Sequence, residues 1–157
     1  MGNGLKLSIR KVTLDDAKFL WVLRNQTAVR KNSFNTKKVP YHGHEDWLVN
    51  KIADRKFAFY LITKGREPIG QIRFDQNGKK SLVNISISKK FTGQGFGKRA
   101  IEMATKKYVR NTKRKKVIAY AKEYNVPSIR SFEGAGYENR GKVTVQGNKC
   151  IRLVYSK

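Results

Sequence analysis

The sequence predicts an α/β fold, with a mixed, mostly antiparallel sheet flanked by helices. Stretches in which apolar and polar residues alternate, typical of half-buried strands, are interspersed with stretches whose apolar residues recur at helical spacing. Several predicted strands are separated only by short glycine-containing segments, which favour antiparallel hairpins. The 157 residues, 39% of them hydrophobic, suffice for one core, so we expect a single domain over residues 1–157.

The N-terminal part begins with a strand and a helix. Residues Leu5 to Val12 alternate and predict a half-buried strand. Thr13 is a helix cap, and Asp16 lies three residues later, where a short acid can complete a capping box. The helix that follows continues to Asn25. Its predicted apolar face consists of Phe19, Leu20, Val22 and Leu23.

A second helix and three strands follow. The polar segment RKNSFNTKKVP is predicted to be a linker, and it leads to a helix around His44 to Ile52. Strands are predicted from Phe57 to Thr63 and from Pro68 to Asp75, with a hairpin turn at KGRE. The QNG turn precedes a third alternating strand, SLVNISIS, over residues 81–88.

The C-terminal half begins with the glycine run FTGQGFGKRA. Apolar residues at helical spacing follow it, and the short apolar run from Val117 to Ala121 predicts a buried strand. Asn125 is a helix cap, with Pro127 in the first turn. Tyr137 to Val145 and Cys150 to Tyr155 predict a terminal hairpin.

The chain is strongly basic. Lys and Arg total 35 against 11 Asp and Glu, which gives a formal charge of +24 and predicts an anionic partner. Nucleic acid, an acidic membrane surface, a phosphorylated cofactor and a phosphorylated substrate all satisfy this inference. The basic run from Lys106 to Lys116 is interpreted first as a solvated helix end, and second as a contact for a nucleotide phosphate or RNA. No aromatic residues interleave as single-strand binding would require, so nucleic acid is not the favoured partner.

Cysteine and histidine are rare in this chain. Cys150 stands alone, so no internal disulfide can form, and only His42 and His44 offer imidazoles, so we expect no metal site. No apolar run approaches the roughly 20 residues needed to cross a bilayer. We therefore expect a protein of the reducing cytoplasm that does not bind membranes.

The glycine run has two interpretations. Gly93, Gly95 and Gly97 lie at every second position between a predicted strand and a helix, followed at once by Lys98 and Arg99. The pattern is neither a Walker A loop nor GxGxxG. A turn without Cβ atoms at a helix start can direct several backbone N–H groups at a diphosphate. The alternative is an ordinary flexible strand-to-helix loop.

Two motifs point to a family. The segment ISISKKFTGQGFGKRAIEMA resembles the acetyl-CoA motif of the GNAT superfamily of N-acetyltransferases, with Thr92 where Arg or Gln is usual. The segment NVPSIRSFEGAGYEN resembles the second motif of that superfamily, including Asn125 and Phe132. The resemblance implies acetyl-CoA as cofactor and a GNAT fold with splayed central strands. The implied coenzyme-binding residues are Ile85, Ser86, Ile87, Thr92, Gly93, Gln94, Gly95, Phe96, Gly97, Lys98, Asn125 and Phe132.

The N-terminal half resembles a subgroup of these enzymes. The segments WVLRNQTAVRKNSFN, HEDW and GQIRFD are similar to those of N-acetyltransferases that act on nucleotide-linked amino sugars, as in pseudaminic-acid biosynthesis. The resemblance implies that this half binds the acceptor. The candidate substrate-binding residues are Arg24, Asn25, Arg30, Asn32, Ser33, Phe34, Asn35, Trp47 and Arg73, whose arginines suit a UDP diphosphate.

Candidates for proton transfer are few. Many relatives place an acid-donating Tyr at the position of Phe132, which has no proton to give, so Tyr124, Tyr137 and Tyr120 are the alternatives, and solvent is another. Asn84 and Tyr120 stand where relatives often carry acids. His44 has a pKa suited to accepting an amine proton, although a partly exposed helical His is often an ordinary solvated residue. Glu123 is the remaining candidate base, and the predicted catalytic residues are His44, Glu123 and Tyr124.

The sequence therefore predicts an acetyl-CoA-dependent N-acetyltransferase, with a UDP-linked amino sugar as the favoured small-molecule acceptor. A protein or ribosomal-protein amine is one alternative, and a polyamine suits a chain of charge +24 poorly. A module that binds acetyl-CoA or nucleic acid without turnover is the other alternative. The sequence leaves open whether the protein forms a homodimer.

Overall fold

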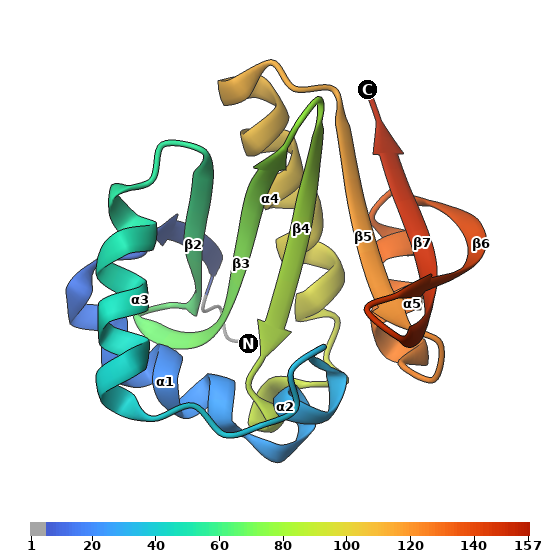
Figure 1. Cartoon of the computed structure of the whole chain (residues 1–157). Coiled ribbons are helices and arrows are strands. Elements are labelled where there is room, and N and C mark those ends of the chain that lie inside the picture. Colours follow the sequence, from blue (N-terminus) through green and yellow to red (C-terminus); the bar gives the residue numbers. More distant parts are fainter. Residues whose placement is uncertain (1–5) are drawn as a thin grey trace.

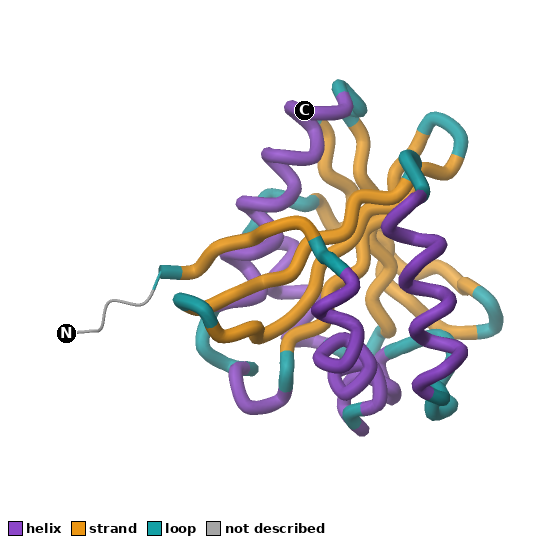
Figure 2. The backbone as a smooth tube through the Cα atoms, turned by 90° about the vertical axis from the view of Figure 1, so that its left-hand side faces the viewer, coloured by secondary structure: helices purple, strands orange, loops and turns teal. Residues whose placement is uncertain are grey.

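The computed structural model describes residues 6–157, in which a seven-stranded sheet carries helices on both faces (Figures 1 and 2). The strands are β1 (Leu7–Lys11), β2 (Phe57–Lys64), β3 (Glu67–Asn77), β4 (Lys80–Ile87), β5 (Lys116–Lys122), β6 (Glu138–Val145) and β7 (Asn148–Ser156). The α-helices are α1 (Ala17–Asn25), α2 (Thr27–Asn32), α3 (Tyr41–Ala53), α4 (Phe96–Thr112) and α5 (Val126–Gly134). Short 3-10 turns cover Leu14–Asp16 and Lys89–Phe91.

The sheet order is β1-β2-β3-β4-β5-β7-β6. Only β4 and β5 pair in parallel, and the other pairs are antiparallel. This confirms the predicted mixed, mostly antiparallel sheet. The predicted first strand is found from Leu7, and Leu5 lies outside the described residues.

Two details of the N-terminal prediction are wrong. Val22 does not belong to the apolar face of α1, since it is 46% exposed. The predicted linker begins inside a helix, because α2 extends to Asn32. No residue of α2 is buried, so the helix has no apolar periodicity that a sequence pattern could show. An extended residue, Gln26, separates α2 from α1.

Strands β4 and β5 diverge along their length. Their pairing is confined to Ser81 with Val117 and Leu82 with Ile118. From there the two strands separate toward the end of the sheet where α2 and the start of α4 lie (Figure 1). This confirms the predicted splayed central strands and divides the sheet into two halves that meet at one end.

The closed end of the split is held by Arg114, in the segment after α4. Its Nε donates to Ser81 Oγ at 2.9 Å, and its Nη2 donates to the main-chain carbonyls of Gly78 and Lys80. Ser81 Oγ also lies 2.8 Å from the hydroxyl of Tyr108 in α4. These contacts join the β3–β4 turn to α4, so the divergence of the strands starts from a fixed point.

Each face of the sheet has its own core. On the α4 face the rings of Phe74 and Tyr108 stack with centroids 4.3 Å apart, within a cluster that extends to Leu153 of β7. On the opposite face Leu20 of α1 and Leu48 of α3 pack against Leu61 of β2. Alternate residues of the central strands therefore point to different layers, and the polar residues of β3 and β4 described below lie on the α1–α3 face.

Residues with other chemical roles are few in the described chain. Cys150 is a free, buried thiol. Among residues 6–157, no group of three or more His, Cys, Asp or Glu side chains is placed to hold a metal ion. In the same residues no helix has both the length and the apolar character needed to cross a bilayer.

Candidate active site

The split between β4 and β5 opens into a cleft of about 270 Å³. β4 supplies one wall, β5 and α5 supply the other, and α2 covers part of the opening. The residues that line it are Ala28, Val29, Asn32, Ser33, Val83, Asn84, Ile85, Ser86, Ile87, Phe91, Thr92, Gly93, Gly95, Phe96, Gly97, Ile101, Tyr120, Ala121, Asn125, Pro127, Ser128, Ser131 and Phe132. Among the described residues, therefore, no Asp, Glu, His, Lys, Arg or Cys side chain lines this cleft.

The glycine turn lies at the open end of the cleft. Gly93 and Gly95 have φ values of +76° and +82°, a backbone conformation that favours glycine. Gly95 is the N-cap of α4, so the unpaired N–H groups of the first helical turn face this end. A Cβ atom on Gly97 would lie only 3.4 Å from Ser131 Oγ. The turn thus exposes main-chain donors without side-chain obstruction, which fits a coenzyme diphosphate.

The main chain of β4 offers further groups to the cleft. Ser88 N–H, just after β4, donates to the carbonyl of Ile69 in β3 at 2.8 Å. In an antiparallel ladder, residues two apart share the direction of their N–H and C=O groups. Those of Ile85 and Ile87 are therefore directed away from β3, into the gap that β5 leaves beyond the Leu82–Ile118 pair. Such free main-chain groups can pair with an extended ligand in the way a missing strand would.

Most of the predicted coenzyme residues lie together. Of the twelve, ten line the cleft, and these are Ile85, Ser86, Ile87, Thr92, Gly93, Gly95, Phe96, Gly97, Asn125 and Phe132. Gln94 and Lys98 do not line it. Gln94 Nε2 donates to the Lys90 carbonyl at 3.3 Å, and the aliphatic part of Lys98 covers Gly134.

Polar side chains follow β4 on the α1–α3 face. Gln71 Nε2 of β3 donates to Asn84 Oδ1 at 2.9 Å and to Ser86 Oγ at 3.2 Å. Gln26 Nε2 donates to Ser88 Oγ at 3.0 Å. Since these oxygens accept from glutamines, Asn84 and Ser86 have N–H and O–H donors left for the cleft.

A cluster of basic groups lies beside this row. It comprises Arg24, Arg30, His44 and Arg73, which we call the cationic cluster. Arg73 is the cross-strand partner of Asn84, and its guanidinium lies 5.4 Å from the ring of Trp47. Arg24 donates to the Asn35 carbonyl at 2.7 Å. Arg24 Nη1, Arg30 Nε and His44 Nε2 are buried without a hydrogen-bond partner in the described part of the chain.

The cluster perturbs the titration of its own members. Burial, with a smaller contribution from the charge of Arg24, lowers the pKa of Arg73 to about 10. Burial, with the neighbouring charge of Arg30, also lowers the pKa of Arg24. The pKa of His44 is lowered by burial first and then by Arg73 and Arg24. The charge of Asp75 favours the charged form of Arg73, but it does not offset the effects of burial and of Arg24.

The structure corrects the expectation that His44 is partly exposed, since it is 6% exposed. It lies in α3 with its ring 5.5 Å from that of Trp47. Asn32 and Ser33, two of the predicted acceptor residues, line the cleft. Asn25 instead pairs with the main chain of Val39, donating to its carbonyl and accepting from its N–H. Phe34, another predicted acceptor residue, does not line the cleft.

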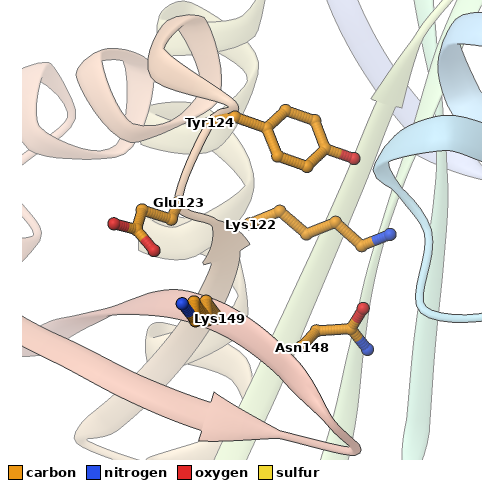
Figure 3. A pocket seen from close by; sticks show the side chains of 5 residues that line it. All are labelled: Lys122, Glu123, Tyr124, Asn148 and Lys149. Carbon is orange, nitrogen blue, oxygen red and sulfur yellow. The ribbon is translucent and has the colours of Figure 1, made fainter.

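Glu123 and Tyr124 lie in a different hollow, of about 380 Å³, beside the β5–α5 connection. Figure 3 shows Lys122 and Tyr124 directed toward the same side and Glu123 pointing away. Tyr124 OH and Lys122 Nζ donate to the Lys31 carbonyl at 2.6 and 3.0 Å. Glu123 forms an ion pair with Lys142 at 3.3 Å. None of the three predicted catalytic residues, His44, Glu123 and Tyr124, lines the cleft between β4 and β5.

Sequence patterns missed several residues of the site. Gln71 lies in the segment GQIRFD but was not singled out, because nothing in the sequence shows that its side chain contacts Asn84 and Ser86. Ser128 and Ser131 lie on the α5 wall within the second motif, so the helical spacing from Asn125 could have placed them there. Tyr120 and Asn84 were noted only as departures from acidic positions.

A pair of parallel strands that diverge beside a glycine turn at a helix start is the framework of the GNAT acetyltransferases. The chain belongs to this family: the model of the acetyltransferase (GNAT) domain matches residues 6–138. The protein is accordingly an acetyl-CoA-dependent N-acetyltransferase of the GNAT type. A search of curated proteins found no match.

Solved structures have the same fold. The aminoglycoside acetyltransferase AAC(6')-Ib, in complex with ribostamycin and coenzyme A, is 16% identical with a TM-score of 0.85, over 97% of this chain and 94% of that one. Spermidine N-acetyltransferase from Vibrio cholerae, in complex with CoA and spermine, is 16% identical with a TM-score of 0.84, over 95% and 94%. A domain from Methanocaldococcus jannaschii is 21% identical with a TM-score of 0.83, over 98% and 100%. At these identities the likeness concerns the fold.

Proposed function

We propose that the protein transfers the acetyl group of acetyl-CoA to the amine of a UDP-linked amino sugar. Acetyl-CoA supplies an acetyl group activated as a thioester. In the reaction a carbon–nitrogen bond forms, the carbon–sulfur bond breaks, and the products are the N-acetylated sugar and coenzyme A. The observation that carries the choice of acceptor is the cationic cluster with its unpartnered nitrogen atoms.

The coenzyme side of the proposal rests on the main chain. The turn at Gly93 and Gly95 and the first N–H groups of α4 would hold the diphosphate. The free main-chain groups of Ile85 and Ile87 would bind the extended arm and offer an N–H donor to the thioester oxygen. Losing one such donor typically reduces transition-state stabilisation by about 3–4 kcal/mol.

The acceptor side of the proposal rests on side chains. Arg24, Arg30 and Arg73 lie near one another, and burial together with a neighbouring arginine disfavours the charged forms of Arg24 and Arg73. An anion such as a diphosphate would relieve this repulsion and satisfy the unpartnered donors. The structures that resemble this one bind aminoglycosides or spermine, which are polycations. The cationic cluster and the absence of carboxylates from the described cleft favour an anionic acceptor here.

His44 is the proposed acceptor of the amine proton. Its lowered pKa means that the imidazole is neutral at pH 7, and its Nε2 carries no partner among the described residues. Glu123 and Tyr124 are turned toward the other hollow, so the proposal gives them no part in the chemistry.

A thiol-release assay tests the proposal. Purified protein and acetyl-CoA are mixed with UDP-linked 4-amino sugars, a lysine-containing peptide, spermidine or no acceptor. We expect release with a UDP-amino sugar to exceed the other arms by about tenfold or more, because one charge-assisted hydrogen bond contributes about 1.5–3 kcal/mol. UDP alone should inhibit competitively against the acceptor. Preferred turnover of the peptide or of spermidine would overturn the choice of acceptor.

A further inference from the structure

The leaving sulfur of the reaction needs a proton, and the position that carries a Tyr in many relatives is Phe132 in this chain. Phe132 is 3% exposed and lines the cleft without a polar atom. Three tyrosines are close enough in sequence to replace it, namely Tyr120, Tyr124 and Tyr137. The structure distinguishes them.

Tyr137 is buried in the core. It is 3% exposed, and its hydroxyl lies 2.8 Å from Thr105 Oγ1 of α4. Burial raises the pKa of this phenol, which makes it a weaker acid. It does not line the cleft between β4 and β5, so it has no access to a reacting sulfur.

Tyr124 is hydrogen-bonded to α2. Its hydroxyl donates to the Lys31 carbonyl at 2.6 Å, and its ring lies 5.7 Å from Lys31 Nζ. The side chain faces the hollow at the end of β5, in the direction of Lys122 (Figure 3). Its proton is already used in a hydrogen bond outside the cleft.

Tyr120 lines the cleft itself. It lies two residues beyond Ile118, the last residue of β5 that pairs with β4, and Asn84 lies two residues beyond the partner Leu82. Parallel strands have the same rise per residue, so Tyr120 and Asn84 lie at the same level on opposite sides of the split. In the described chain the structure gives the Tyr120 hydroxyl no hydrogen-bond partner.

This level is where an acyl group would lie. The glycine turn that fits the diphosphate is at the open end of the split, near Ile87, and the arm of the coenzyme would run inward along β4. Four strand residues separate Ile87 from Val83, a distance of roughly 13 Å. The innermost part of the cleft is therefore bounded by Val83 and Asn84 on one side and by Tyr120 on the other.

Other hydroxyls in the cleft are less suitable. Ser86 Oγ accepts from Gln71, and Ser131 Oγ lies beside Gly97, at the end that fits the diphosphate. Thr92 Oγ1 donates to the Lys89 carbonyl at 2.8 Å. Aliphatic hydroxyls are also far weaker acids than a phenol, whose pKa is about 10. Tyr120 carries the one phenol among the described residues that line the cleft.

We propose that Tyr120 is the general acid that protonates the leaving sulfur. As the carbon–sulfur bond breaks, the Tyr120 O–H bond breaks and a sulfur–hydrogen bond forms, which gives the neutral thiol. The phenolate then regains a proton from solvent, and the proton lost by the amine leaves through His44 or solvent. The inference rests on the proposed function only in requiring acetyl transfer from acetyl-CoA, whatever the acceptor.

Tyr120→Phe tests the role, with Tyr124→Phe as the matched control because both changes remove one hydroxyl. With any amine that the wild type acetylates, we expect Tyr120→Phe to lower kcat about a hundredfold, the lower end of the range for a general acid, because a thiolate leaves readily. Tyr124→Phe should leave kcat within about twofold of wild type. A change in kcat below about threefold for Tyr120→Phe, or an equal loss in Tyr124→Phe, overturns the proposal.

A second readout requires no acceptor and no turnover. Calorimetry compares the binding of coenzyme A with that of its desulfo analogue, which lacks the sulfur atom. If the Tyr120 hydroxyl contacts the sulfur, Tyr120→Phe weakens coenzyme A binding by about threefold and leaves binding of the desulfo analogue unchanged. Equal affinities of wild type and Tyr120→Phe for both ligands contradict the contact.

Restoring a phenol at the usual position completes the test. In the Tyr120→Phe background, the additional change Phe132→Tyr should recover at least about tenfold of the lost kcat, since it places an acid in the same cleft. Failure of every UDP-amino sugar as acceptor would contradict the proposed substrate, yet the coenzyme binding comparison would still decide the role of Tyr120. The two proposals therefore fail separately.

Discussion

The cleft and the cationic cluster beside it are built from different groups. The coenzyme side consists mainly of main-chain groups and glycines, with Gly93 and Gly95 in the left-handed region and no charged side chain among its described lining residues. The proposed acceptor side is the cationic cluster beside the cleft, whose side chains carry buried, unpartnered nitrogen atoms in the described part of the chain. One side is made by backbone geometry and the other by charge.

The difference indicates a division of roles. Main-chain N–H groups at a helix start bind a diphosphate whatever the neighbouring side chains are, so they suit a cofactor that is common to many enzymes. Buried arginines near one another are unfavourable without an anion, so they suit selection of one class of substrate. Changes on one side should leave binding on the other side intact, and the following predictions test this independence.

The largest expected effect is on the coenzyme side. Gly95→Val places a β-branched residue at a φ of +82°, where such residues are strained, and should weaken coenzyme A binding by about a hundredfold. Binding of UDP should stay within about twofold of wild type, since the cationic cluster is untouched. Calorimetry with each ligand measures both effects.

The control for this change is Gly43→Ala, in α3. A Cβ atom at Gly43 would meet nothing within 4 Å, so coenzyme A should bind as in wild type. The helix should gain about 0.5–1 kcal/mol of stability. A parallel loss of UDP binding in Gly95→Val would mean that the two sides are not independent.

A smaller effect is expected on the acceptor side. Arg73→Met keeps an unbranched chain against Trp47 but removes the charge, and should weaken UDP binding by about tenfold while leaving coenzyme A binding unchanged. Urea unfolding should show a higher midpoint than wild type, because a buried cation among like charges has been removed.

Arg66→Met is the matched control, since Arg66 is exposed in the β2–β3 turn. It should change neither UDP binding nor the unfolding midpoint beyond about 0.5 kcal/mol. Equal losses of UDP binding in the two variants would show that the net charge of the chain, and not the cationic cluster, attracts the nucleotide.

The smallest expected effect concerns pH. His44 has a lowered pKa in the folded protein, so below its ordinary value of about 6.5 the unfolded chain binds a proton that the folded chain resists. The free energy of unfolding should fall as the pH decreases below 6.5, by at most about 1.4 kcal/mol per pH unit. His44→Gln should remove this loss. Urea titrations of both proteins at pH 7.5 and 5.5 measure it, and parallel losses would contradict the burial of a neutral imidazole.

Much of the coenzyme side could be predicted from the sequence because its information is local. The glycine turn, the cap at Asn125 and the alternation in residues 81–88 are each contained in a few neighbouring residues. Asn125 Oδ1 accepts from Ser128 N–H at 3.4 Å, as the cap predicts. Local conformation depends on local chemistry, so ten of the twelve predicted residues lie in one cleft.

The acceptor side was predicted less completely because its members come from distant segments. Arg24, His44 and Arg73 were each identified, but nothing in their spacing showed that they lie together. Helix α2 was not predicted, since none of its residues is buried. The sequence favoured Tyr124 over Tyr120 as a catalytic residue. Only the structure distinguishes the two, because Tyr120 lines the cleft and Tyr124 lines the other hollow.

By itself, the sequence determined the order of the strands and of the helices other than α2, the glycine turn and the excess of positive charge. These follow from hydrophobic period, from turn chemistry and from composition, which are properties of neighbouring residues or of their sum. Tertiary structure alone decided that β4 and β5 separate after two paired residues, that Arg24 and Arg73 lie near His44, and that Tyr120 lines the split. Those features depend on which segments are brought together in space, and the number of residues between two positions does not fix the distance between them in the fold.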